Sequence, residues 1–279
     1  MLKVLLTGAN SYIGTHISGY LSRWPDEYHI ETIDMKGNAW RKQSFSGYDS
    51  IIHVAGIAHI RTKNLDEQAR KEYWQINAVL PVEVAKKARD EGTAQFIFFS
   101  SMSVYGEIGN LNPPVIITKD TKPAPKDIYG KSKLFAENEL GKLSTEYFRV
   151  CILRPPMVYG PGAKGNYNAL VKIARLLPIF PDISNQRSML HVDNLCTFIK
   201  ELIDLNESGL FYPQDPEYIA TSQLVRTLAL QQNKRIRLNK MLNPFVYILI
   251  RFPGEIGLKA RKAFGSLIYE QGMSRLQIE

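Results

Sequence analysis

The sequence predicts an α/β protein, in which a doubly wound parallel sheet is followed by a smaller, mostly helical C-terminal cap. In the first half of the chain, short apolar runs alternate with longer stretches of helical character. The first run leads directly into a glycine-rich turn. After about residue 155 the alternation gives way to Pro- and Gly-rich loops interspersed with helices. We therefore expect a sheet domain over residues 1–155 and a cap over residues 156–279, with some cap segments returning to the sheet domain.

Short apolar runs are the expected strands, and each follows a polar or helical stretch. The run that opens the chain is continuously apolar, which is typical of a parallel strand buried on both faces. The runs lie at residues 2–6, 29–33, 50–54, 95–99 and 149–153. Only fourteen residues separate Asp34 from Asp49, too few for a complete helix and strand. We therefore expect the sheet to be abbreviated between residues 35 and 49.

Helices are expected between these strands and in the cap. Those of the sheet domain cover residues 11–23, 66–91 and 129–143. Those of the cap cover residues 167–176, 193–206 and 221–231. The crossovers between parallel strands should be right-handed.

Composition is typical of a globular protein and argues against a metal site. Hydrophobic residues make up 44% of the chain. Cys151 and Cys196 lie in apolar surroundings, so we expect core residues rather than a disulfide. The five histidines show no metal-ligand spacing, so no metal is expected. The first residues run into the glycine turn without room for a signal peptide, which predicts a cytoplasmic protein.

Positive charge is concentrated toward the C-terminus. From Lys234 onward, nine Lys or Arg against three Glu account for six of the eight net positive charges. Such a segment could meet nucleic acid or an anionic membrane, but a solvated helical face is the simpler interpretation, and we expect no nucleic-acid partner. The apolar run 244–250 is far shorter than the ~20 residues that span a bilayer. Peripheral membrane contact, through an interfacial helix over residues 242–252, stays an alternative.

A glycine-rich turn joins the first strand to the first helix. It reads T-G-A-N-S-Y-I-G over residues 7–14, and this strand, turn and helix context makes the motif a credible dinucleotide site. Gly8 allows the tight turn, and Gly14 allows the helix to pack closely on the sheet. The helix N-terminus offers N–H groups and a partial positive charge to a pyrophosphate. The turn therefore predicts a Rossmann fold.

Asp34 decides the expected choice of dinucleotide. It lies twenty residues beyond Gly14, at the end of the second strand, where a carboxylate can accept hydrogen bonds from an adenosine ribose. Its charge would repel the 2′-phosphate of NADP, so we expect NAD. Lys36 and Arg41 lie close enough in the sequence to weaken this preference.

Tyr129 and Lys133 form the predicted catalytic pair. They are four residues apart in Y-G-K-S-K and would share one face of a helix. An ammonium group there would lower the pKa of the phenol toward the working pH. Ser101 lies upstream, next to an expected strand. Together with the dinucleotide turn, these side chains describe a hydride-transfer site.

The motifs together resemble the extended short-chain dehydrogenase/reductase family, specifically its nucleotide-sugar epimerase/dehydratase branch, over most of the chain. The turn resembles T-G-x-x-G-x-x-G, with Ser11 in place of the middle glycine. S-S-M-S-V-Y-G and Y-G-K-S-K resemble the Ser, Tyr, Lys set, with Ser101 as the catalytic hydroxyl and Ser100 as the fallback. The resemblance implies NAD, held by Gly8, Asn10, Ser11, Tyr12, Ile13, Gly14, Asp34, Val54, Ala55, Gly56, Asn77, Ser100, Tyr129, Lys133 and Pro156.

Later stretches resemble the family's substrate-binding segments. L-R-P-P-M-V-Y-G-P-G resembles the segment that joins core and cap, with Met157 where many members carry Asn. Q-R-S-M-L-H-V-D-N-L resembles a stretch whose arginine binds a diphosphate, so Arg187 would take that role; a structural salt bridge is the alternative. The resemblance implies substrate contacts from Ser101, Ser103, Met157, Asn166 and Arg187.

The resemblance implies an NAD-dependent nucleotide-sugar 4-epimerase, which acts on a UDP-hexose or UDP-N-acetylhexosamine through a 4-keto intermediate and serves surface polysaccharide synthesis. Family dehydratases carry Asp-Glu directly after the catalytic hydroxyl, where this chain has Met102 and Ser103, so dehydration is discounted. An NAD(P)H-dependent 4-reductase or dehydrogenase stays an alternative, as does a non-catalytic dinucleotide-sensing protein. Relatives also imply a homodimer formed through residues 66–91 and 129–143.

Overall fold

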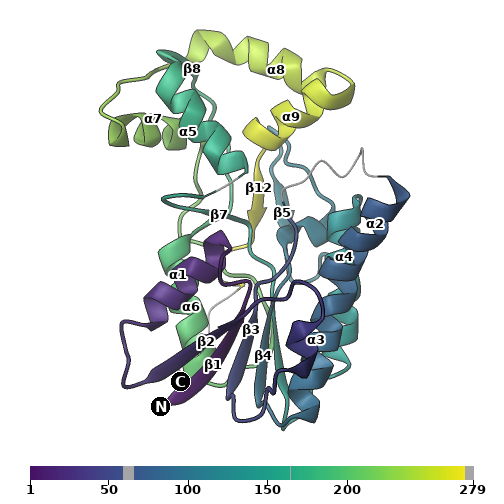
Figure 1. The fold of residues 1–279 in the computed structure, drawn as a ribbon. Helices are drawn as coiled ribbons and strands as arrows, with labels where there is room; N and C mark the ends of the chain where they lie inside the picture. The colour runs from purple at the N-terminus through teal and green to yellow at the C-terminus, as the bar shows by residue number, and fades with distance from the viewer. Residues whose placement is uncertain (59–65, 164, 274–279) are drawn as a thin grey trace. The chain divides into compact units, whose positions relative to one another are not determined.

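The computed structural model describes residues 1–58, 66–163 and 165–273 (Figure 1). Contacts group the chain into two compact units. Unit 1 consists of Met1–Gly106, Lys122–Gly160 and Leu190–Pro213, and unit 2 consists of Glu107–Thr121, Pro161–Met189 and Gln214–Glu279. The chain passes between the units more than once. The division into residues 1–155 and 156–279 stays a prediction from the sequence.

Unit 1 is built on a six-stranded parallel sheet, which confirms the predicted doubly wound fold (Figure 1). Its strands run in the order β10-β6-β4-β3-β1-β2, and each neighbouring pair is parallel. They are β1 (Leu2–Thr7), β2 (Tyr28–Ile33), β3 (Ser50–His53), β4 (Gln95–Phe99), β6 (Arg149–Leu153) and β10 (Gly209–Phe211). The order reverses between β1 and β3. In open parallel sheets ligands bind at such a switch point, beyond the carboxyl ends of the strands.

Helices cover both faces of this sheet (Figure 1). On one face α1 (Tyr12–Leu21) packs against α6 (Val192–Asp204), and on the other α3 (Leu80–Asp90) packs against α4 (Ile128–Gly141). The helix α2 (Glu67–Trp74) continues into α3 through a π-helical turn at Gln75–Val79. Between β2 and β3 the chain forms a 3-10 turn, Ala39–Lys42.

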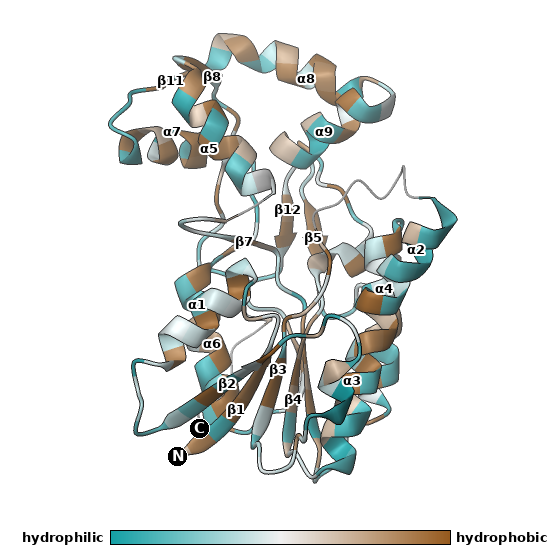
Figure 2. Ribbon diagram, viewed as in Figure 1, coloured by the Kyte–Doolittle hydropathy of each residue, from teal (hydrophilic) through white to brown (hydrophobic). Residues whose placement is uncertain are grey.

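A hydrophobic core holds the sheet against α3 and α4. Leu5, Ile51 and Phe96 contribute to it from the strands, and Ala85 and Leu140 from the helices; each of these five is 0% exposed. Figure 2 shows the apolar character of these strands. Burying a side chain such as Leu or Phe contributes about 1.5–3 kcal/mol. The core thereby fixes the strand ends from which the site is built.

Unit 2 consists of four helices and two short parallel strand pairs among the residues described. The helices are α5 (Asn166–Leu176), α7 (Thr221–Gln231), α8 (Asn243–Arg251) and α9 (Gly254–Phe264). The strand pairs join β5 (Val115–Ile117) to β12 (Leu267–Tyr269) and β8 (Ile179–Pro181) to β11 (Arg237–Asn239). Of the helices described in either unit, none is long and apolar enough to cross a membrane.

Candidate active site

β1 ends in a turn that leaves space only for glycine. Gly8 has a φ of 71°, and a Cβ on it would lie 2.8 Å from the backbone N of Ala55. A Cβ on Gly14 would lie 2.4 Å from the carbonyl oxygen of Gly8. Both distances are shorter than van der Waals contact, so any larger residue would push the backbone apart. The two glycines therefore bring β1, α1 and the loop after β3 together at the switch point.

Ser11, which stands where the family has its middle glycine, is the N-cap of α1. Its backbone N–H donates to the carbonyl of Gly8 at 2.9 Å, and its Oγ accepts the N–H of Gly14 at 3.0 Å. This bond satisfies one of the unpaired N–H groups of the first helical turn. The O–H of Ser11 donates to no atom of the described residues, so it remains available to an oxygen of a bound pyrophosphate.

Replacing Gly14 with alanine should lower the free energy of unfolding by about 1–3 kcal/mol, because the added methyl group overpacks the contact with Gly8. Gly19 offers a matched control on the same helix, since a Cβ there would meet no atom within 4 Å. Gly19→Ala should raise the free energy of unfolding by about 0.5–1 kcal/mol. Urea denaturation measures both changes, and a Gly14→Ala protein as stable as the wild type would contradict the packing described.

Two buried side chains hold the loop after β3. The N–H of Ala55 donates to Thr7 Oγ1 at 3.2 Å, and Thr7 Oγ1 lies 3.1 Å from Nδ1 of His53. Burial lowers the pKa of His53 to about 3, so its ring is neutral and can accept the Thr7 proton. This chain of bonds fixes residues 54–56, the predicted floor of the cofactor site. His53 is the last residue of β3, and its role follows from its burial rather than from its position in the sequence.

Asn77 ties the same loop to the π-helical turn between α2 and α3. It is fully buried, its Oδ1 accepts the N–H of Ile57 at 2.9 Å, and its Nδ2 donates to the carbonyl of Ile57 at 3.1 Å. Gly56 lies beside it, where a Cβ would be 3.6 Å from Nζ of Lys133. The cofactor loop therefore reaches the predicted catalytic lysine. Within the described residues, the side chain of Asn77 hydrogen-bonds to backbone atoms of Ile57 and Tyr73, so direct contact with NAD stays a prediction.

Asp34 is exposed after β2, as an adenosine ribose would require. Its Oδ1 accepts the N–H of Lys36 at 2.9 Å. The guanidinium of Arg41 pairs with Glu83 at 2.7 Å and lies 4.5 Å from the ring of Trp40. One of the two cations that could have favoured a 2′-phosphate is therefore committed to another carboxylate. The glycine turn, the free Ser11 hydroxyl and Asp34 together fit NAD.

Ser101, Tyr129 and Lys133 come together at the carboxyl end of β4. Asp127 caps α4 by accepting the N–H of Gly130 at 2.8 Å, which sets the start of the helix that carries Tyr129 and Lys133. The side chain of Tyr129 lies next to that of Ser101. Lys133 is buried, and its Nζ donates to the carbonyl of Phe99 at 2.7 Å. The predicted catalytic set is thus assembled within one unit of the protein.

The pKa values within this set differ from the sequence-based expectation. Burial raises the pKa of Tyr129 to about 12, and the neighbouring Ser101 hydroxyl lowers it by less. Burial also lowers the pKa of Lys133 to about 8, against the raising effect of Glu137. The expectation that Lys133 lowers the pKa of the phenol is wrong for this arrangement. The ammonium Nζ lies 6.0 Å from the Tyr129 ring centroid and is bonded to a carbonyl, while desolvation acts on the phenol directly.

A buried ion pair lies behind the lysine, and sequence reasoning did not identify it. Glu137 and Arg154 are 4% and 6% exposed, and Nη2 of Arg154 lies 2.5 Å from Oε2 of Glu137. Ser100 donates its hydroxyl to Glu137, and Arg154 also donates to the hydroxyl of Tyr105 at 2.8 Å. Since Ser100 is buried and bonded to Glu137, Ser101 is the hydroxyl that meets Tyr129. In the sequence, this pair was indicated by the position of Glu137 one helical turn after Lys133, which places both residues on the same face of the helix.

The predicted substrate residues fall in both units. Ser103 lies in unit 1, where its Oγ accepts the hydroxyl of Ser101 at 3.1 Å. Met157 is half-buried on β7 (Met157–Tyr159), directly after the buried Pro156. Asn166 begins α5 in unit 2, and its side chain lies outside the described part of the structure. Of the predicted substrate residues whose side chains are described, Ser101 and Ser103 are hydrogen-bonded to each other.

Arg187, in unit 2, has the character expected of an anion-binding residue. Its Nη1 donates to the carbonyl of Lys262, whereas its Nε is buried without a hydrogen-bond partner. Burial lowers the pKa of its guanidinium. Within the described residues no carboxylate forms an ion pair with Arg187, so the structural salt bridge is not seen there. Buried charges are ordinarily paired, and a diphosphate would supply the missing partner.

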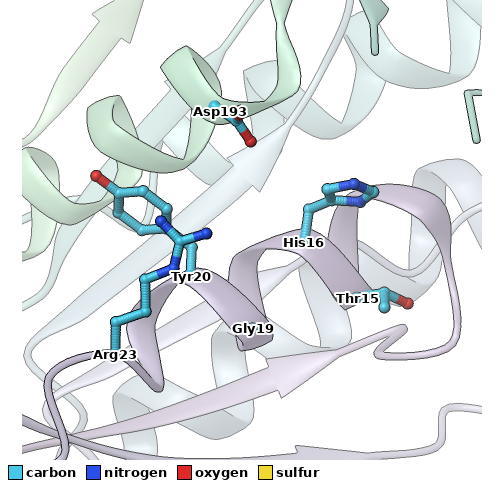
Figure 3. Close-up of a pocket in the computed structure, with 6 residues that line it drawn as sticks. All are labelled: Thr15, His16, Gly19, Tyr20, Arg23 and Asp193. Atoms are coloured by element: carbon cyan, nitrogen blue, oxygen red, sulfur yellow. The ribbon is translucent and has the colours of Figure 1, made fainter. Parts of the chain in front are cut away.

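A separate shallow pocket of about 220 Å³ lies between α1 and α6 (Figure 3). Its lining residues are Thr15, His16, Gly19, Tyr20, Arg23 and Asp193. None of the predicted site residues lines it, and ligand sites commonly measure ~300–1,000 Å³. It is therefore not a candidate for the dinucleotide or the substrate. Among the described residues there is also no cluster of three or more side chains suited to holding a metal ion.

Comparisons with known proteins identify the family of this chain. The sequence model of the NAD dependent epimerase/dehydratase family matches residues 4–211. A UDP-glucose 4-epimerase of Vibrio cholerae is 30% identical over 253 residues, which cover 83% of this chain and 76% of the relative. A UDP-2-acetamido-2,6-beta-L-arabino-hexul-4-ose reductase of Pseudomonas aeruginosa is 25% identical over 249 residues, which cover 84% of this chain and 59% of that protein.

A solved structure shows the same fold. The UDP-glucuronic acid 4-epimerase of Bacillus cereus, in complex with NAD, matches with a TM-score of 0.71 at 17% identity, over 98% of this chain and 90% of that one. At that identity the likeness concerns the fold, whereas the family is shown by the sequence model that matches residues 4–211. The chain therefore belongs to the NAD dependent epimerase/dehydratase family, and its cofactor is NAD, as predicted.

Proposed function

We propose that this protein is a nucleotide-sugar 4-epimerase that acts on a UDP-hexose or a UDP-N-acetylhexosamine through a 4-keto intermediate. The observation that carries the proposal is that Ser101, Tyr129 and the buried Lys133 lie together at the carboxyl end of β4. A phenol and a hydroxyl placed side by side can bind a sugar hydroxyl and move its proton. The 30% identity to a UDP-glucose 4-epimerase supports the substrate class.

The residues divide the chemistry between them. The positively charged nicotinamide of bound NAD would favour the phenolate form of Tyr129. Ser101 would hydrogen-bond the oxygen on carbon 4 of the sugar, and the Tyr129 phenolate would take the proton from that oxygen as the carbon loses its hydride. Lys133, anchored on the carbonyl of Phe99 at 2.7 Å, places a positive charge next to the cofactor loop. Bound NAD supplies the acceptor for the hydride and returns it, so that the sugar is neither oxidised nor reduced overall.

The residues after Ser101 support epimerisation over dehydration. Met102 and Ser103 begin a 3-10 turn, Met102–Tyr105, and Ser103 is bonded to Ser101. Neither side chain is an acid at neutral pH, and expulsion of water from the sugar would need one. Arg187, with its unpaired Nε, is the proposed contact for the diphosphate, which would keep the keto sugar bound while it turns over.

The proposal is tested by incubating the purified protein with UDP-glucose, UDP-galactose and their N-acetyl forms, without added reduced cofactor. We expect chromatography to show interconversion at carbon 4 for at least one pair, with no net change in the absorbance of reduced nicotinamide. Failure to interconvert any pair, combined with stoichiometric oxidation of NADH or NADPH by a 4-keto nucleotide sugar, would overturn it.

That second outcome defines the alternative function, a nucleotide-sugar 4-reductase or dehydrogenase. The same Ser101, Tyr129 and Lys133 would then protonate a ketone once per turnover. The specific observation in its favour is the 25% identity to a hexulose reductase of Pseudomonas aeruginosa. We favour the epimerase because the relative of higher identity is an epimerase.

Two further expectations accompany the proposed enzyme. We propose that it supplies sugars for surface polysaccharides from the cytoplasm.

We also propose a homodimer formed through α2, α3 and α4. Trp74 on α2 and Phe135 on α4 form an aromatic pair with ring centroids 5.4 Å apart, and Phe135 is 40% exposed. A partly exposed aromatic pair is suited to packing against a second copy.

A further inference from the structure

The helix α8 has two apolar faces. Val246 is buried and Ile250 is half-buried, so this face packs against unit 2. Phe245, Ile248 and Phe252, by contrast, are 64%, 56% and 51% exposed. Their spacing of three and four residues places these three side chains on one side, away from Val246. Packing within the described residues therefore accounts for one face of α8 and leaves the other apolar face exposed.

The exposed face extends beyond the helix. We define the apolar stripe as Met241, Phe245, Ile248, Leu249, Phe252 and Ile256, which are each between 41% and 81% exposed. It begins just before α8 and ends on α9, which packs against α8 (Figure 2). Single exposed apolar residues are ordinary, but a group of neighbouring ones marks an interaction surface.

Cations surround the apolar stripe. Lys240 precedes α8, Arg251 ends it, and Lys259 and Lys262 follow on α9; all four are exposed. Lys259 lies 3.5 Å from Glu255, whereas Lys240 and Arg251 form no ion pair with any described residue. The surface therefore combines a strip of apolar side chains with a positive rim. A partner that fits it must offer negative charge around an apolar interior.

We propose that the apolar stripe docks on the surface of an anionic phospholipid bilayer. Phe245, Ile248 and Phe252 would enter between the headgroups, and Lys240 and Arg251 would meet the lipid phosphates. Amphipathic helices with aromatic and aliphatic residues on one face and cations beside them bind membranes in this way. α8 has nine residues and is about 14 Å long, so it would lie along the surface of a core that is ~30 Å thick.

Charge argues against a second copy as the occupant. A symmetric dimer through the apolar stripe would place the same patch on both partners, so that cations of one copy would face cations of the other. Like charges facing each other across an interface disfavour that arrangement. Lipid phosphates instead compensate the cations, and acyl chains accept the apolar side chains. The anionic bilayer is thus the partner that satisfies both parts of the surface.

Vesicle flotation tests this proposal with the full chain. The protein is mixed with vesicles of phosphatidylcholine alone or with added phosphatidylglycerol, and the floated fraction is measured. We expect binding to the anionic vesicles that weakens with salt. Ile248→Ser should weaken it about tenfold. Leu230→Ser on α7 is the matched control, since Leu230 is likewise 56% exposed, and it should bind as the wild type does.

The charged rim has its own pair of variants. Arg251→Gln should weaken binding to anionic vesicles about fivefold, and Arg226→Gln, an exposed change on α7, should not. Thermal denaturation and circular dichroism establish that each variant is folded. Equal flotation of Ile248→Ser and Leu230→Ser, or a wild type that binds neither kind of vesicle, would overturn the proposal. A concentration-dependent dimer that forms without lipid and is abolished by Ile248→Ser would also overturn the proposal. Because the readout is lipid binding, it is independent of the epimerase assay.

Discussion

Replacing Tyr129 with phenylalanine should lower kcat roughly 10²- to 10⁴-fold, the usual contribution of a general acid or base, while NAD still binds. The change removes the hydroxyl that meets Ser101 and keeps the ring, whose centroid lies 6.0 Å from Nζ of Lys133. The cofactor residues Gly8, Ser11 and Asp34 are untouched. Steady-state turnover of the UDP-sugar and a fluorescence titration of NAD measure the two effects separately.

Tyr147→Phe is the matched control, because Tyr147 is 82% exposed and lies outside the site. It should leave both turnover and NAD binding unchanged. A Tyr129→Phe protein that keeps full turnover would remove the phenol from the mechanism. If the wild-type protein binds NAD but turns over none of the sugars, the non-catalytic dinucleotide-sensing alternative becomes the better description.

Strands and helices could be predicted from the sequence where a local run of apolar residues indicates their burial. The strands β1, β3, β4 and β6 each contain an apolar run, since a parallel strand is covered on both faces. β10 (Gly209–Phe211) was missed because three residues at a sheet edge carry no such run. Residues 66–91 have helical character throughout, but the π-helical turn at Gln75–Val79 divides them, and Asn77 uses that turn to bond the loop after β3.

The parts of the site that lie within short sequence motifs could be predicted. Gly8, Gly14, Tyr129 and Lys133 belong to short motifs whose spacing shows their chemistry. The pKa values could not be predicted, because they depend on burial by residues distant in the sequence. The Glu137–Arg154 ion pair was not predicted for the same reason. In a sequence, a single Glu on a helix and a single Arg after a strand are each typical of a solvent-exposed charge.

That buried pair carries the largest expected effect on stability. Arg154→Met should lower the free energy of unfolding by about 3–5 kcal/mol, because Glu137 would keep its charge in the core without a partner. Replacing both residues, as Glu137→Leu with Arg154→Met, should restore much of that loss, since no charge is then left buried. Urea denaturation of the three proteins measures the differences. Glu139→Gln, at a half-buried position of α4 whose carboxylate pairs with the exposed Lys142, is the control and should change stability by less than about 0.5 kcal/mol.

The same double variant separates a structural role of Glu137 from an electrostatic role at the site. Glu137 raises the pKa of Lys133, which burial lowers to about 8. Lys133 is an ammonium group below its pKa, so kcat/KM should fall as pH rises through about 8 in the wild type. Without the charge of Glu137 the pKa of Lys133 drops further, so the fall of kcat/KM on the alkaline side of the pH profile should occur at lower pH. If kcat/KM of a stably folded double variant falls at the same pH as in the wild type, Glu137 supports the fold and leaves the charge of Lys133 unchanged.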